Sequence, residues 1–225
     1  RELREMATVS MFAHDVETSG LSRWKGARII GHSFAYRRPN GQVRAFYAPC
    51  RHQDVGANMF ADKRQFDPAQ LSAQLKPVLE GGALKCGHNY NFDVVLCDAD
   101  GISVAGSICD TLIACRLINE NFRSYKLTEC LKRSPVLHEA GWKAEIRDQE
   151  KAAATHLRMT LTEMRDAYGY ALLEIDTLGQ SACQDAVYEL TLAAWAMPHQ
   201  PQSPHIRSPQ QDLFWPCTHI PTPRA

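Results

Sequence analysis

Two acidic residues near the start of the chain, Asp15 and Glu17, are separated by a single residue. They come at the end of a segment, residues 8–15, that mixes small and apolar residues at the length of a β-strand. Side chains two residues apart leave the same face of a sheet, so these carboxylates should lie side by side. Such a pair is unfavourable unless a cation neutralises it, because each charge raises the pKa of the other. The alternative is a solvated strand end, since charged residues are often simply exposed.

A third acid, Asp93, follows a short apolar segment over residues 83–86 that predicts a buried strand. It ends the sequence Gly87-His88-Asn89-Tyr90-Asn91-Phe92-Asp93, in which Asn89 can cap a helix and Asp93 lies one helical turn further on. This arrangement would direct the Asp93 carboxylate back toward the strand ends. Ligand sites in sheets of this kind collect at the carboxyl ends of the strands, where Asp15 and Glu17 are also expected.

A fourth acid, Asp185, interrupts the apolar face of a helical segment over residues 181–190. It could be a surface residue held in a salt bridge. Four acids that converge from three separated segments would instead suit two divalent metal ions about 3.5 to 4 Å apart. Carboxylate oxygens are the ligands that Mg²⁺ and Mn²⁺ prefer, so we expect two such ions as cofactors.

The remaining pattern predicts the elements that must position these acids. Residues 27–37 and 42–48 predict a β-hairpin with a turn at Pro39-Asn40-Gly41. Residues 68–80 predict a helix that Asp67 caps. Periodic apolar positions predict further helices over about 89–99, 110–119, 126–132, 160–168 and 181–197. Strands first and helices afterwards predict an α/β fold with a mixed β-sheet covered by helices.

Length and composition fit one main domain. The chain has 225 residues and 44% hydrophobic residues, enough for a single well-buried core. We expect an N-terminal leader over residues 1–6, the domain over 7–197, and a tail or linker over 198–225. That last segment holds seven of the twelve prolines, which favours extended chain.

Nothing in the sequence predicts a membrane partner or an oxidising compartment. No run of about 18 apolar residues could span a bilayer, and no signal peptide opens the chain. The eight cysteines are scattered singly, without a C-x-x-C pair, and we interpret them as reduced thiols. We therefore expect a soluble, cytoplasmic protein in a reducing, intracellular environment. The formal net charge is zero, but nine Lys and Arg against two acids between Arg23 and Arg64 could contact phosphates or could be solvated strand edges.

Together the motifs resemble the DEDD-type 3′-to-5′ exonuclease (proofreading) domain of family-A DNA polymerases. The matching segments, which cover residues 7 to about 198, are Asp15-Val16-Glu17-Thr18 with Gly20-Leu21, Gly87-His88-Asn89 with Phe92-Asp93, Asp110-Thr111-Leu112, and Ala182-x-x-Asp185-Ala186 with Leu190 and Leu192. The resemblance implies a ribonuclease H-like fold, a mixed β-sheet with helices on both faces. It also implies that the metal ligands are Asp15, Glu17, Asp93 and Asp185.

The activity that the resemblance implies is hydrolysis of terminal phosphodiester bonds of DNA by a two-metal-ion mechanism. Thr18 and Leu21 would hold the terminal nucleotide, Leu21 as an apolar wedge beside the last base, and Asn89 and Phe92 would help to bind the substrate. The expected partners are single-stranded or frayed 3′ ends of DNA, alternatively RNA, and a covalently linked or separate DNA polymerase. Proteins of this kind occur in bacterial and phage-type replication.

One position departs from the family pattern. Proofreading domains carry a tyrosine four residues before the last aspartate, where its hydroxyl orients the attacking water, and this chain has Ser181 there. Ser181 could hold the water through an intervening one, so we expect reduced but not absent cleavage. Tyr168, Tyr170 and Tyr188 are possible substitutes, although packing roles are expected for them. The alternatives are a ribonuclease D-like RNA 3′ trimming enzyme, or a catalytically lapsed domain that binds single strands or acts as a scaffold.

Overall fold

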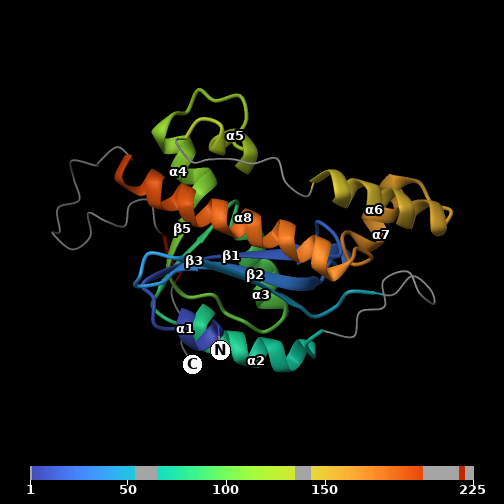
Figure 1. Ribbon diagram of the computed structural model, residues 1–225, viewed down its shortest axis with the longest axis horizontal. Coiled ribbons are helices and arrows are strands. Elements are labelled where there is room, and N and C mark those ends of the chain that lie inside the picture. Colours follow the sequence, from blue (N-terminus) through green and yellow to red (C-terminus); the bar gives the residue numbers. More distant parts are fainter. Residues whose placement is uncertain (1, 54–64, 135–142, 200–217, 221–225) are drawn as a thin grey trace.

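The computed structural model of the protein describes residues 2–53, 65–134, 143–199 and 218–220. Its centre is one sheet in the strand order β3-β2-β1-β4-β5-β6 (Figure 1). The strands are β1 (Met11–Thr18), β2 (Ile29–Arg37), β3 (Val43–Pro49), β4 (Leu84–Gly87), β5 (Gly106–Asp110) and β6 (Thr218–Ile220).

The sheet is mixed, as the sequence predicted. β1 pairs with β2 and β2 with β3 in antiparallel fashion, whereas β1, β4 and β5 run parallel to one another. The predicted hairpin is confirmed as β2 and β3. β1 starts at Met11 and continues to Thr18, so Asp15 and Glu17 lie inside the strand and not at its end. β5 was not predicted, because it has only five residues and opens with glycine and serine, which carry little strand signal.

The helices are α1 (Glu2–Met6), α2 (Pro68–Leu79), α3 (Asn91–Ala99), α4 (Thr111–Ile118), α5 (Leu127–Leu131), α6 (Lys143–His156), α7 (Leu161–Tyr168) and α8 (Ile175–Ala196). Asp67 caps α2, as predicted, and Asp110 caps α4, since each side chain accepts a hydrogen bond from a backbone N–H of the first turn. α8 begins six residues before the predicted helix. α6 was not predicted because most of its surface is polar and few apolar positions mark its inner face.

The helices cover both faces of the sheet. α8 crosses one face, where its Ala186, Leu190 and Ala193 pack on alternate residues of β1, β2 and β4. The opposite faces of β1 and β2 pack against α2 and α3. Figure 1 shows α8 on one side of the sheet and α1 and α2 on the other, with α4 and α5 near one end of α8 and α6 and α7 near its other end.

Segments outside residues 7–197 also contact the sheet. Met6 of α1 is fully buried in the core, and the Tyr36 hydroxyl on β2 hydrogen-bonds to both Glu2 and Glu5. At the other end of the chain, β6 pairs with β5 in antiparallel fashion. The other residues of the expected tail, apart from Pro198 and His199, lie outside the described part of the chain.

Two further findings concern the cysteines and the length of the helices. Seven described cysteines are free thiols and six of them are buried, whereas Cys217 lies outside the described residues. Within the described part of the chain, every helix is too short or too polar to cross a lipid bilayer.

Candidate metal and nucleic-acid site

β1 presents Asp15 and Glu17 on the face of the sheet that α8 covers. Ala13, at the same alternate position of the strand, packs against α8, whereas Phe12 and Val16 belong to the core on the other face. Both carboxylates are half-buried. The predicted side-by-side placement of the two acids therefore agrees with the strand geometry.

Asp93 joins this pair from the first turn of α3, where it is 3% exposed. The backbone N–H of Val16, between Asp15 and Glu17, donates a 2.9 Å hydrogen bond to Asp93 Oδ1. The carboxyl groups of Asp15 and Asp93 lie close enough to share a hydrogen bond when one of them is protonated. α3 thus places its carboxylate against the centre of β1.

Asp185 approaches the same point from α8, and the electrostatics connect all four acids. Burial, followed by the charge of Asp185, raises the pKa of Asp15 to about 7. Burial and the charges of Asp15 and Asp185 raise the pKa of Glu17 well above its usual value. Burial and the charge of Asp15 do the same to the pKa of Asp93. The predicted acids therefore form one cluster whose like charges repel one another.

The carboxylate oxygens are nevertheless not gathered tightly. Among the described residues, one group of three potential metal-binding side chains has ligand atoms that all lie within 4.8 Å of one another: His14, His32 and Cys97. This group lies on the opposite face of the sheet from the acids. The four acids are spaced more loosely than this group, and their like charges repel one another. Their donor chemistry still fits hard divalent cations such as Mg²⁺ and Mn²⁺.

Sequence reasoning missed a fifth acid, Glu189, one helical turn after Asp185 on α8. Its side chain is 2% exposed, and its pKa is raised well above the usual value by burial and by the charges of Asp15, Asp93 and Asp185. The backbone N–H of His88 donates a hydrogen bond to the carboxylate, yet Oε2 has no hydrogen-bond partner in the described structure. The four-residue spacing from Asp185 was the signal that could have identified it.

The two histidines that flank the predicted ligands hold the surrounding elements together. His14, on the other face of β1, hydrogen-bonds through Nδ1 to the Tyr90 hydroxyl and through Nε2 to His32 Nδ1. His88 Nε2 donates to the Tyr125 carbonyl over 2.7 Å, and Nδ1 lies 2.8 Å from the Thr111 hydroxyl oxygen. The latter contacts fix the β4–α3 connection beside the acids.

The prediction that Asn89 caps a helix was wrong. Asn89 has a φ of 61°, and the residue at the cap position of α3 is Tyr90, without a side-chain cap. The carboxylate of Asp110 instead accepts hydrogen bonds of 3.0 Å from the backbone N–H groups of Asn89 and Tyr90. Because Asp110 satisfies these N–H groups, the Asn89 side chain is not needed as a cap and is exposed.

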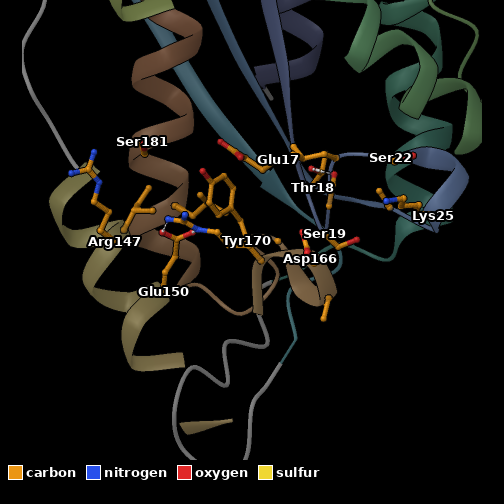
Figure 2. A pocket seen from close by; sticks show the side chains of 18 of the residues that line it. Glu17, Thr18, Ser19, Ser22, Lys25, Arg147, Glu150, Asp166, Tyr170 and Ser181 are labelled. Atoms are coloured by element: carbon orange, nitrogen blue, oxygen red, sulfur yellow. Dashed lines mark hydrogen bonds and ion pairs between the residues drawn. The ribbon is translucent and has the colours of Figure 1, made fainter. Parts of the chain in front are cut away.

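A cavity of about 810 Å³ opens beside the acids. Five of the predicted site residues line it: Glu17, Thr18, Leu21, Ser181 and Asp185. Asp15 and Asp93 are not among its lining residues. Four basic side chains also line it. Lys25 comes from the short 3-10 helix after β1, Lys143 and Arg147 come from α6, and Arg165 comes from α7, where it pairs with Glu150 (Figure 2).

A second hollow of about 310 Å³ is lined by the remaining predicted substrate residues, Asn89 and Phe92, together with Trp24. Leu21 borders both cavities and is 89% exposed, an unusual exposure for a large apolar side chain. Thr18 is buried, and its hydroxyl donates to the Gly20 carbonyl, which stabilises the turn that presents Leu21.

Two hydroxyl side chains of the large cavity, Ser181 and Tyr170, bear on the role of the missing tyrosine. Ser181 is 7% exposed on α8 and lines the large cavity. Tyr170 lines it as well, and Figure 2 shows its ring between Glu150 and Glu17, with the hydroxyl end toward Glu17. The charge of Glu17, after burial, contributes to raising the pKa of Tyr170 to about 12. Tyr170 is therefore a cavity residue, although the sequence analysis expected a packing role for it.

Backbone contacts hold Tyr170 in this place. Its N–H donates to the Thr18 carbonyl over 3.1 Å. Gly169, with a φ of 53°, packs so closely on the backbone of residues 18–20 that a Cβ would lie 2.4 Å from the Thr18 carbonyl oxygen. Tyr168 and Tyr188 belong instead to packed clusters, as expected.

The fold, but not a family, is identified by comparison with known proteins. No model of a known protein family and no curated protein sequence matches the chain. Brucella melitensis NrnC bound to pGG has a TM-score of 0.53 with 16% identity, over 87% of this chain and 75% of that one. A structure described as the apo form of a nuclease has a TM-score of 0.51 with 17% identity, over 84% and 72%. The chain has the ribonuclease H-like α/β fold that its motifs led us to expect.

Proposed function

We propose that this protein is a metal-dependent 3′-to-5′ exonuclease of the proofreading type, which hydrolyses terminal phosphodiester bonds of DNA. The observation that carries the proposal is the cluster of Asp15, Glu17, Asp93 and Asp185, whose charges repel one another beside a cavity with basic residues. A fold does not bury such a cluster for stability, because the repulsion is unfavourable. A function that brings cations to the cluster accounts for it.

Mg²⁺ or Mn²⁺ ions held by these four acids would supply an activated water and would stabilise the leaving 3′ oxygen. The residues of the chain then bind and orient the strand. Glu17 and Asp185 border the cavity, so they face the scissile phosphate, while the more deeply placed Asp93 is held by the Val16 N–H. The hydrogen bond from Val16 holds the Asp93 carboxylate in position before the substrate binds.

The cavity also suits the terminal part of a nucleic-acid strand. Leu21 stands exposed between the two hollows, where its apolar side chain can lie against the last base. Lys25, Lys143 and Arg147 offer positive charge to phosphates. Contacts of these kinds read the backbone and the faces of bases, so we expect weak sequence preference.

The lack of the usual tyrosine at Ser181 leads us to propose attenuated cleavage. A serine hydroxyl is a poor proton acceptor at neutral pH, and Ser181 is mostly buried. Tyr170 supplies a tyrosine hydroxyl in the same cavity, next to Glu17. Together these side chains can hold a water near the acids.

RNA 3′ trimming is the second candidate. It is motivated by the four acids, which ribonuclease D-like enzymes share, and by the fold likeness to NrnC, whose structure contains pGG. A polymerase that is covalently linked or separate would serve as partner only if DNA is the substrate. A catalytically lapsed domain that binds single strands is the third reading, motivated by Ser181.

The test is digestion of matched single strands of DNA and RNA, labelled at the 5′ end, first with Mg²⁺ and then with Mn²⁺. Asp15→Asn is the inactive variant. Asp98→Asn is the control, because Asp98 lies on α3 but is exposed and pairs with Arg23 away from the acids. We expect shortening of DNA from the 3′ end, retained in Asp98→Asn and lost in Asp15→Asn. A strong preference for RNA would transfer the proposal to RNA trimming, binding without cleavage would indicate the lapsed domain, and neither binding nor cleavage would refute all three.

A further inference from the structure

Glu189 is a buried carboxylate whose second oxygen is left without a partner. It lies on α8, one turn after Asp185, on the side of the helix that faces the sheet. One stabilising contact to the carboxylate is the backbone N–H of His88, at the end of β4. Oε2 is buried and has no hydrogen-bond partner in the described structure, and no salt bridge there involves Glu189.

The neighbouring charges make burial of the Glu189 carboxylate still less favourable. The charged groups that act on Glu189 are the carboxylates of Asp15, Asp93 and Asp185, all of the same sign. A buried carboxylate normally has a basic partner, as Glu150 has in Arg165, whose Nε and one terminal nitrogen bind its two oxygens. Glu189 is equally buried, at 2% exposed against 1% for Glu150, but faces acids.

A neutral acid does not resolve this arrangement. If Oε2 carried a proton, the resulting O–H would need an acceptor, and none lies within hydrogen-bond distance in the described structure. Either form of Oε2 therefore requires a partner from outside the described part of the chain. Carboxylates that converge in this way commonly bind a divalent cation.

We propose that Glu189 is a fifth carboxylate of the cation site and contributes its free oxygen Oε2 to the binding of divalent ions. The inference rests on the proposed function, since it concerns the same site, but it assigns to that site a residue outside the four acids of the motif. α8 then supplies two cation-binding carboxylates one turn apart, and β4 and α8 are joined at the site through the His88 N–H.

Calorimetric titration of the metal-free, full-length protein with Mn²⁺ tests the assignment without measuring activity. Glu189→Gln keeps the shape and the acceptor for the His88 N–H but removes the charge, and it imitates a neutral acid. We expect it to weaken Mn²⁺ binding by about tenfold or more, the size of effect that residues supporting a metal site have. Mn²⁺ should also raise its melting temperature less than that of the wild type. Asp98→Asn, which also removes one charge from this region, should bind as the wild type does.

The outcomes separate this inference from the proposed function. If the wild type binds Mn²⁺, Asp15→Asn loses the binding and Glu189→Gln matches the wild type, then Glu189 is not part of the site and this inference alone is wrong. If the wild type neither binds Mn²⁺ nor cuts DNA or RNA, the proposed function fails as well. Should Glu189→Gln not fold by circular dichroism, Glu189→Asp keeps the charge but withdraws it by one methylene, and unchanged Mn²⁺ affinity in that variant would overturn the assignment.

Discussion

The backbone N–H of Val16 donates a 2.9 Å hydrogen bond to Oδ1 of Asp93. This bond ties the first turn of α3 to the middle of β1, between the two acids that β1 carries. Asp93 therefore cannot move away from Asp15 and Glu17 without losing a buried hydrogen bond, which costs about 1–3 kcal/mol for the group left unpaired. The fold holds the acids near one another in spite of their repulsion.

The repulsion predicts how stability depends on pH. The pKa of Asp15 is about 7 in the folded protein against an ordinary 3.8, so the folded state binds this proton more tightly than the unfolded state does. Its stabilising contribution is then complete below about pH 4 and is lost as the pH rises through about 7. We expect the free energy of unfolding of metal-free protein to fall by on the order of 1–3 kcal/mol between pH 5 and 8.

Urea denaturation in EDTA at those two pH values measures the effect. Asp15→Asn is the matched variant, because it removes the titrating group and should show a weaker pH dependence. Added Mg²⁺ should restore stability at the higher pH, where the acids are ionised. An identical pH dependence in wild type and Asp15→Asn would show that the acids do not repel as described.

Ser181→Tyr should increase the rate of strand cleavage. The new hydroxyl would enter the large cavity next to Asp185, where it can orient a water, and we expect a gain of roughly tenfold or more, within the range of proton-transfer catalysis. Ser181→Phe is the control, since it adds the ring without the hydroxyl. Single-turnover cleavage of a labelled strand measures both, and equal rates in the two variants would exclude a role for the hydroxyl.

Tyr170→Phe should lower the rate of cleavage by about tenfold, at the lower end of what such positioning contributes. The hydroxyl of Tyr170 is directed toward Glu17 in the cavity, and the substitution leaves the ring in place. Tyr168→Phe is the matched control two residues earlier, in a packed cluster outside the cavity lining. If both variants cut as fast as the wild type, Tyr170 is a packing residue only.

Arg147→Ala should weaken the binding of a single strand and make it less sensitive to salt. Arg147 is exposed on the cavity wall, and loss of one phosphate contact lowers the slope of log affinity against log salt by about 0.7 for single strands. Lys151→Ala removes a basic residue of the same helix, one that pairs with Asp148 and does not line the cavity. Fluorescence anisotropy over a salt series measures strand affinity for both variants and the wild type. If the Arg147→Ala slope equals that of the wild type, the strand does not contact Arg147 in the cavity.

Much of the fold could be predicted because local signals were strong. Asp67 and Asp110 precede apolar helical faces, and both cap their helices in the structure. The alternation of side chains along a strand placed Asp15 and Glu17 on one face. Conversely, β5 and α6 carry weak local signals, and their positions depend on pairing with β4 and on packing against α7 and α8.

The rest of the site depends on tertiary contacts that a linear pattern does not reveal. Glu189 belongs to the acid cluster only because β4 lies under that turn of α8, where the His88 N–H meets it. Lys143 and Arg147 reach the cavity only because α6 packs against α7 and α8. Asn89 was misjudged because its backbone is held by Asp110, which is distant in sequence.

Crystals soaked in Mn²⁺ and measured at the manganese absorption edge test the central claim most directly. The account predicts anomalous density for two ions among the carboxylates of Asp15, Glu17, Asp93 and Asp185, with the oxygens drawn closer together than in the absence of metal. Density at His14, His32 and Cys97 instead, or none beside carboxylates that remain apart, would contradict it.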